Sequence, residues 1–131
     1  MILGIGTDIV AVERVRGMLE RHGEHFCVRH FTEREREWCD AGRGNARAER
    51  YAARFAAKEA VSKALGCGIG ADAGFLEIEV LRDPSPQGAP PELVLSGRAK
   101  ATADRKGVTR MHLSLAHERE MAVAMVVLEG D

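Results

Sequence analysis

An apolar run at the start of the chain, residues 2–10, predicts a β-strand because Ile, Leu and Val dominate it. Period-two alternation gathers one set of side chains on a single face: Leu3, Ile5, Thr7 and Ile9. The other face combines two glycines with a carboxylate: Gly4, Gly6 and Asp8. Glycine weakens a strand and usually marks close approach of a ligand or another backbone segment. On that face, Asp8 must be paired, hydrogen-bonded or metal-bound, or it caps the next helix.

Helical periodicity follows this strand in three segments. Residues 11–21 have apolar positions at helical spacing and a mainly basic outer surface. Thr32 is followed three residues later by Glu35, which is the capping-box spacing and predicts a helix from there to about residue 42. A longer pattern covers residues 46–65, and Gly66 can end it in a left-handed conformation.

The second half of the chain consists mostly of strand patterns. Residues 75–83 and 92–96 predict an antiparallel pair joined by a turn at PSPQGAPP. Residues 97–106 predict a short helix, and residues 111–117 and 121–129 predict a β-hairpin. The order of elements predicts an α+β fold, a mainly antiparallel sheet packed against a long central helix.

Length and composition limit the class of protein. A chain of 131 residues without internal repeats suits one domain, and a net charge of −1 gives no overall basic field for nucleic acid or membranes. The cysteines are odd in number, lie outside metal-site spacing and suit a reducing cytosol: Cys27, Cys39 and Cys67. We expect a soluble cytoplasmic protein, because no signal peptide is recognisable and no apolar run approaches the roughly 18 residues of a membrane span.

The segment RFAAKEAVSKALG, residues 54–66, carries the densest chemical signal. Its alanines form a small-residue helix face that allows close packing on a sheet. The opposite arc carries three cations, a carboxylate and a hydroxyl: Arg54, Lys58, Lys63, Glu59 and Ser62. Such a set suits a metal-bound polyphosphate, with Asp8 as the second carboxylate for Mg²⁺. The alternative is an ordinary Glu59–Lys63 surface pair beside a solvated Lys58.

Other candidate groups give weaker signals. His117 shares a strand face with Leu113 and Leu115, which predicts a hydrogen-bonded core histidine. The other histidines show no metal-ligand spacing: His22, His25, His30 and His112. Neither glycine run matches a dinucleotide-binding fingerprint, and there is no Walker lysine motif.

Three blocks of the sequence, GIGTDIVAVERV, RFAAKEAVSKALGCGIG and HLSLAHEREMAVAMVVLE, resemble in this order the motifs of holo-[acyl-carrier-protein] synthases. These are the small, stand-alone 4′-phosphopantetheinyl transferases. The resemblance implies one such domain with that family's fold over residues 1–131. It also implies transfer of 4′-phosphopantetheine from coenzyme A to a serine of apo-acyl carrier protein, releasing adenosine 3′,5′-bisphosphate. Mg²⁺ would be required, and the product would serve fatty-acid or polyketide biosynthesis.

Motif positions imply roles for individual residues. Asp8 and Glu59 match the metal-binding carboxylates, and Glu59 and Lys63 form the catalytic pair. Positions that match contacts to coenzyme A are Arg54, Ser62, Lys63 and His117. Ala116 and Met121 depart from the usual motif, which leaves local cofactor contacts open.

The resemblance also implies an assembly. By this resemblance we expect a homotrimer with active sites at the subunit interfaces. His117 of one chain would then face the metal-binding carboxylates of a neighbour. Larger transferases carry a second acid where this chain has Val10, which favours the small type.

The implied reaction also suggests which residues act as the base and which bind the carrier protein. Serine attack on a diphosphate joins anionic partners, so charge neutralisation and positioning dominate catalysis. Glu59 acting through a bound water is the first candidate for the base, with a direct role or the substrate's own phosphate as alternatives. Because acyl carrier proteins are acidic, we expect docking on the first helix at Arg14, Arg16 and Arg21, although each could be merely solvated.

Two other functions remain open on the sequence. One is a non-catalytic, Mg²⁺-dependent module that binds coenzyme A or a nucleotide. The other is a hydrolase of the coenzyme A diphosphate, although the chain lacks a Nudix-type acidic helix.

Overall fold

The computed structural model of the chain describes residues 1–81 and 91–131. Its elements in chain order are β1 (Ile2–Ala11), α1 (Val12–His30), α2 (Glu33–Asp40), α3 (Asn45–Ala64), the 3-10 helix η1 (Phe75–Glu77), β2 (Ile78–Leu81), β3 (Glu92–Leu95), α4 (Gly97–Arg105), β4 (Arg110–His117) and β5 (Met121–Glu129). The predicted α+β class is confirmed. No helix within these described ranges is long and apolar enough to cross a membrane.

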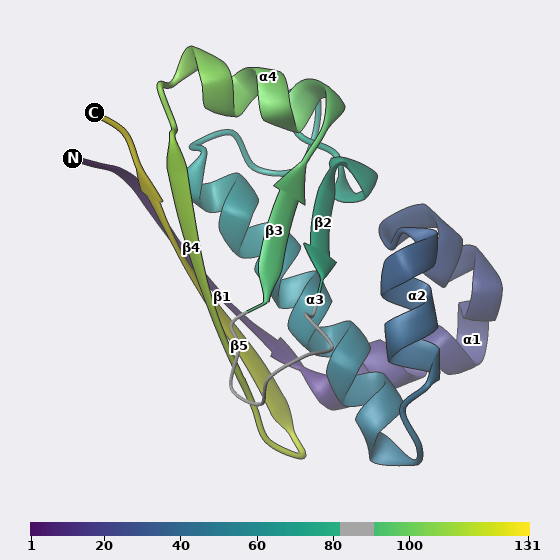
Figure 1. Cartoon of the computed structure of the whole chain (residues 1–131). Helices are drawn as coiled ribbons and strands as arrows, with labels where there is room; N and C mark the ends of the chain where they lie inside the picture. The colour runs from purple at the N-terminus through teal and green to yellow at the C-terminus, as the bar shows by residue number, and fades with distance from the viewer. Residues whose placement is uncertain (82–90) are drawn as a thin grey trace.

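The strands form two antiparallel sheets. The larger sheet has the order β1-β5-β4, so the first strand of the chain pairs with the last, and β4 and β5 form the predicted hairpin. Strands β2 and β3 form a separate pair. Helix α3 lies along the larger sheet, and α1 and α2 pack on α3 away from that sheet (Figure 1). The long helix is therefore the centre of the fold, as predicted.

Two glycines of β1 permit unusually close packing between this strand and α3. A Cβ atom on Gly4 would collide with the carbonyl oxygen of Ala64, and one on Gly6 would collide with that of Ala60. The close approach that the glycines predicted is confirmed, and the approaching group is the backbone of α3. Strand β1 is thereby held against the alanine face of the helix.

The helix boundaries follow the capping signals. Thr32 caps α2 by accepting the Glu35 amide, and the Glu35 carboxylate accepts the Thr32 amide in return. Gly66 follows α3 with φ of +79°, as its position predicted. Helix α1 continues past its predicted end near residue 21 to His30, because Gly23 takes a φ of +47° and kinks the helix without ending it.

The segment predicted as a strand over residues 75–83 is only partly a strand. Phe75–Glu77 forms a 3-10 turn, because the Glu77 carboxylate accepts the backbone amides of Gly74 and Arg98 and holds the chain there. The strand itself is β2, Ile78–Leu81, paired with β3 as predicted. The end of the predicted strand and the PSPQGAPP turn up to residue 90 lie outside the described residues.

A buried ion pair joins α2 to α3, and it corrects the prediction for Lys58. Neither Lys58 nor Glu35 is exposed, and the Lys58 ammonium lies 2.7 Å from Glu35 Oε1. The ammonium also donates to the Phe75 carbonyl, and Glu35 Oε2 accepts the Val80 amide. Lys58 therefore cannot be a phosphate-binding or solvated surface cation, because α2, η1 and β2 cover its side of the helix.

Candidate active site

Three charged side chains meet where α3 crosses β1. The Lys63 ammonium donates to Asp8 Oδ1 and to the Thr7 carbonyl, both at 3.0 Å. The Lys63 side chain is 51% exposed and that of Asp8 is 18% exposed, so the group faces solvent on one side. Glu59 lies one turn before Lys63 on α3. The close contact at Gly4 and Gly6 therefore brings Asp8 to the predicted arc of the helix.

Glu59 and Asp8 interact electrostatically. Partial burial raises the pKa of Glu59, and the nearby charge of Asp8 raises it further. The positive charges of Lys63, Arg14 and His30 oppose this rise. Two carboxylates that repel one another at a half-buried site would both be stabilised by a shared cation.

The carboxylate pair fits a Mg²⁺ ion on chemical grounds. Mg²⁺ prefers oxygen ligands and is usually held by one or two protein carboxylates together with substrate phosphates and waters. Within residues 1–81 and 91–131, no group of three or more His, Cys, Asp and Glu side chains could hold a metal by itself. Asp8 and Glu59 therefore offer an incomplete ligand set that a phosphate-containing substrate would complete.

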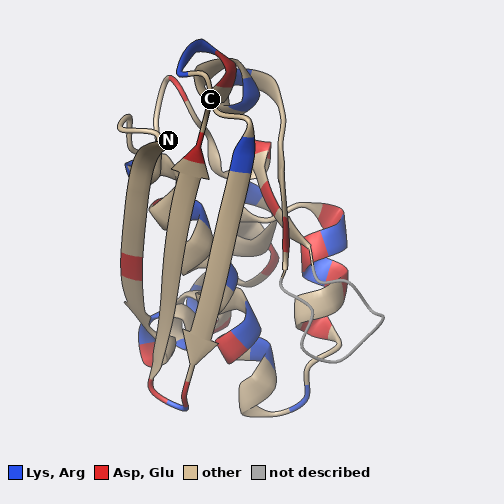
Figure 2. Ribbon diagram, turned by 60° about the vertical axis from the view of Figure 1, so that its left-hand side comes forward, with Lys and Arg blue, Asp and Glu red and all other residues tan. Residues whose placement is uncertain are grey.

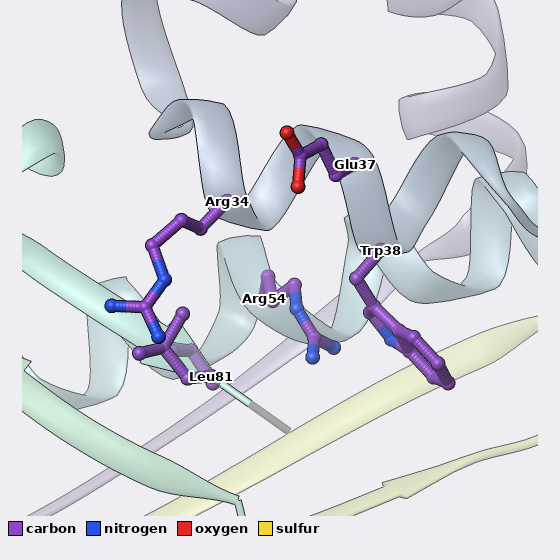
Figure 3. Close-up of a pocket in the computed structure, with 6 residues that line it drawn as sticks. Arg34, Glu37, Trp38, Arg54 and Leu81 are labelled. Atoms are coloured by element: carbon purple, nitrogen blue, oxygen red, sulfur yellow. The ribbon is translucent and has the colours of Figure 1, made fainter. Parts of the chain in front are cut away.

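Arg54 lies in a separate pocket of about 210 Å³ between α2, α3 and β2. The other residues that line the pocket are Arg34, Glu37, Trp38, Val80 and Leu81. In Figure 3 the Arg54 guanidinium lies between Arg34 and the ring of Trp38, and its Cζ is 5.9 Å from the centre of that ring. Two guanidinium groups and an indole in one pocket offer a contact surface suited to a phosphorylated aromatic ligand.

The other groups around Arg54 were not predicted from the sequence. Arg34 and Trp38 are four residues apart on the helix that the capping box predicts, so the spacing places them on one face. Arg50 stacks on the Trp38 ring with its Cζ 3.8 Å from the ring centre and donates to the Trp38 carbonyl at 2.7 Å. The sequence spacing could therefore have paired Arg34 with Trp38 on α2. The contacts of Trp38 with the arginines of α3 depend on how the two helices pack.

In the described part of the chain, Ser62 and His117 make their polar contacts with groups other than the carboxylates of Asp8 and Glu59. The Ser62 side chain is fully buried, and its hydroxyl donates to the Glu59 carbonyl at 2.7 Å, within the same helix. His117 is 45% exposed at the end of β4, with Nδ1 3.5 Å from Glu49 Oε2. The expectation of a core histidine is wrong, because the strand reaches past the buried part of the sheet at this residue. The cofactor contacts of both residues stay predictions.

The three arginines of α1 differ in their surroundings. Arg14 is exposed, and it is near enough to Glu59 to lower the pKa of that carboxyl. Arg16 forms an ion pair with Glu13 on the same helix. Arg21 is exposed, with Nη2 3.7 Å from the Met18 sulfur. Arg14 is thus the arginine that adjoins the carboxylate site.

An aromatic cluster beside Glu59 was not predicted from the sequence. His30, at the end of α1, packs on Phe26 and Phe75 with ring centroids 4.7 Å apart in both cases. Its centroid is 5.9 Å from that of Phe55, which precedes Glu59 by one turn of α3. The rings come from α1, α3 and η1, so no local spacing in the sequence reveals the cluster.

The family comparison defines the class of protein. The model of the 4′-phosphopantetheinyl transferase superfamily matches residues 4–124. Related proteins named holo-[acyl-carrier-protein] synthase include one from Desulforudis audaxviator, 47% identical over 130 residues that cover 99% of this chain and 95% of the relative. Another, from Gloeobacter violaceus, is 45% identical over 126 residues, 96% of this chain and 92% of the relative.

Solved structures give the same result. The holo-(acyl-carrier-protein) synthase from Bacillus anthracis, crystallised in complex with CoA (3′,5′-ADP), is 41% identical with a TM-score of 0.81, covering 100% of this chain and 99% of that one. The Helicobacter pylori enzyme in complex with coenzyme A is 30% identical with a TM-score of 0.81, covering 95% and 99%. The chain belongs to the holo-[acyl-carrier-protein] synthase family of this superfamily, as its three motif blocks predicted.

Proposed function

We propose that this protein transfers 4′-phosphopantetheine from coenzyme A to a serine of apo-acyl carrier protein, giving holo-carrier protein and adenosine 3′,5′-bisphosphate. The observation that carries the proposal is the meeting of Asp8, Glu59 and Lys63 at the crossing of α3 and β1 in a chain of this family. A non-catalytic coenzyme A or nucleotide-binding module is not favoured, because relatives that match nearly the whole chain are named as synthases.

Asp8 and Glu59 would hold the Mg²⁺ ion that this reaction uses. Their mutual repulsion and their oxygen donors support this assignment. Bound Mg²⁺ supplies positive charge that stabilises the diphosphate oxygens and the leaving phosphate. The chain needs no third protein ligand, because substrate oxygens and waters complete the coordination of Mg²⁺.

The chain's cations position the diphosphate. Lys63 is exposed on one side and flexible, so its ammonium can leave the Thr7 carbonyl and contact a diphosphate oxygen while staying near Asp8. Arg54 would bind a phosphate further along coenzyme A, since its guanidinium lines a pocket with Arg34. Together these groups offset the charge of the anionic donor and orient it for attack by the serine.

The positions of Asp8 and His117 support an active site shared between chains. Asp8 lies on β1 and His117 on β4, which are opposite edges of the larger sheet with β5 between them. Helix α3 packs along this sheet. A cofactor that contacts both residues is therefore more easily accommodated between the β1 edge of one chain and the β4 end of another.

The outer face of the larger sheet supports a homotrimer. Figure 2 shows that the three strands are largely free of charged residues, whereas charges gather on the helices and at the strand ends. Exposed apolar side chains on this face are Leu3, Ile5, Ile9, Met121, Val123 and Met125. An apolar surface of this kind marks an interface. Light scattering should give three times the monomer mass, and Ile5→Asp should reduce it, whereas Val28→Asp on α1 should not.

We place the reaction in the cytoplasm. All three cysteines are free thiols, and Cys27 and Cys39 are buried. Free thiols are typical of proteins from a reducing compartment.

One experiment tests the proposed reaction. The protein is incubated with coenzyme A, Mg²⁺ and an apo-acyl carrier protein, and the carrier is then weighed by mass spectrometry. Addition of one phosphopantetheine group to the carrier serine is the expected result. Cleavage of coenzyme A without a change in the carrier would instead indicate a hydrolase, and binding without turnover would indicate a binding module.

A further inference from the structure

The transfer reaction needs a group that accepts the serine proton, and the residues assigned so far have other tasks. Asp8 and Glu59 would be metal ligands, and a bound cation weakens a carboxylate as a base. Lys63 is a cation that contacts Asp8. A neutral nitrogen base beside these residues would therefore fill a role that the carboxylates fill poorly.

His30 is held in one orientation by its neighbours. The ring packs on Phe26 and Phe75 at 4.7 Å and on Phe55 at 5.9 Å, and it is half-buried. Its Nδ1 lies 2.8 Å from the Phe26 carbonyl oxygen. Together with a further contact to Phe31, these rings and the hydrogen bond restrain His30 more than a surface histidine at a helix end normally is.

The hydrogen bond fixes which nitrogen carries the proton in the neutral ring. A carbonyl oxygen can only accept, so Nδ1 must be the donor toward Phe26. Nε2 then has a free lone pair and can accept a proton. His30 is also the final residue of α1, and the last turn of a helix favours positive charge.

His30 adjoins the carboxylate site without being part of the metal ligand set. Phe55, which its ring contacts, stands one helical turn before Glu59 on α3. The ring is near enough for a positive charge on it to lower the pKa of Glu59, although no hydrogen bond or ion pair joins His30 to Glu59 or Asp8 within the part of the chain that the structure describes. The charged groups of the surrounding elements are Glu59, Lys63, Asp8 and Arg14 on the open side, and Lys58 with Glu35 behind Phe75.

We infer that His30 is a catalytic base of this enzyme, taking the proton of the carrier serine at Nε2 while Nδ1 stays bound to the Phe26 carbonyl. The inference rests on the proposed function. The serine oxygen forms a bond to the pantetheine-side phosphorus, and the bond from that phosphorus to the bridging oxygen breaks. The electron pair leaves with adenosine 3′,5′-bisphosphate, and the imidazolium later loses its proton to solvent.

The test compares two variants at this position with a control on the same helix. His30→Gln removes the base, and His30→Phe removes it while preserving an aromatic ring in the cluster. His25→Gln changes an exposed histidine of α1 and serves as the matched control. For each folded variant, kcat and the KM values for coenzyme A and carrier protein are measured, and coenzyme A binding is measured separately by calorimetry.

The expected result is a loss of about 100-fold in kcat for both His30 variants, with both KM values within about twofold and normal coenzyme A binding. His25→Gln should match the wild type. In a third variant, His30→Ala, added imidazole should restore part of the kcat, which a purely structural role would not allow. The ¹⁵N NMR spectrum of the wild-type imidazole should show the proton on Nδ1.

Several results would overturn the inference. These are a kcat within about threefold of the wild type in either folded His30 variant, or a loss confined to the KM for the carrier protein, which would indicate docking. A proton on Nε2 of the neutral ring would also contradict it. A wild-type protein that binds coenzyme A but leaves the carrier unmodified would refute the proposed function itself, so the two failures are distinguishable.

Discussion

Lys58 and Glu35 form an ion pair with neither side chain exposed, and the pair joins α3 to the first turn of α2. Glu35 simultaneously completes the capping box with Thr32 and accepts the amide of Val80 on β2. The Glu35 carboxylate thus links the start of α2 to strand β2 and to the central helix α3. Burial lowers the pKa of Lys58, and the charge and hydrogen bond of Glu35 oppose this shift.

Removing one partner of this pair should strongly destabilise the protein. Lys58→Met leaves the Glu35 carboxylate buried without its cation, and breaking a buried pair in this way typically costs about 3–5 kcal/mol. Urea unfolding followed by circular dichroism measures the loss. The double variant Lys58→Met, Glu35→Gln removes the unpaired charge but keeps an acceptor oxygen for the backbone amides, so it should recover part of the loss. A double variant no more stable than Lys58→Met would contradict the argument.

Gly6→Ala should destabilise the contact between β1 and α3. The added methyl group meets the carbonyl oxygen of Ala60, which is backbone and cannot rotate away, and overpacking of this kind costs about 1–3 kcal/mol. Transfer activity should fall as well, because Asp8 lies two residues further along the same strand. Gly70→Ala is the control, since a Cβ at Gly70 has no atom within 4 Å. Equal melting temperatures for the two variants would argue against the close contact.

The two lysines of α3 show how far helical periodicity can predict a site. Both Lys58 and Lys63 fall on the arc opposite the alanines, and the period alone treats them alike. Lys63 reaches Asp8 on β1, whereas Lys58 is covered by a partner 23 residues earlier in the chain. The strands, the capping box and the close approach at Gly4 and Gly6 could be predicted because each depends on local spacing.

Features that depend on several distant segments were not predictable in the same way. The rings around His30 come from three elements, and the Arg54 pocket needs α2 and β2 in place. His30 was set aside because it lacks metal-ligand spacing, a criterion that says nothing about a base held by aromatic rings. The motif resemblance bridged part of this gap by naming positions, but it did not give their contacts.

Glu59→Gln should separate activity from stability. The pKa of Glu59 is raised in the folded chain by burial and by Asp8, so the folded chain binds more protons than the unfolded chain above the ordinary pKa of 4.5. The folding free energy therefore becomes less favourable as pH rises through this window. Without Mg²⁺, Glu59→Gln should melt at a higher temperature than the wild type at pH 7, and the difference should shrink as the pH falls toward 4.5.

The same variant should lose Mg²⁺-dependent transfer, because one of the two carboxylates proposed to bind the metal becomes a neutral amide. Melting curves with and without Mg²⁺ provide a second readout. A melting temperature at pH 7 below that of the wild type would contradict the sign derived from the pKa. Near-normal transfer activity would contradict the assignment of Glu59 to the metal site.

Arg14→Glu should weaken carrier-protein binding while leaving coenzyme A binding intact. Arg14 is exposed on α1 beside Glu59, where an acidic carrier must bring its serine. Reversing one charge at such an interface should raise the KM for the carrier about tenfold at low salt, and the effect should diminish as salt screens the interaction. Arg105→Glu on the distant helix α4 is the control, because it makes the same charge change away from the site. Parallel loss of coenzyme A and carrier binding in Arg14→Glu would instead place Arg14 in the cofactor site.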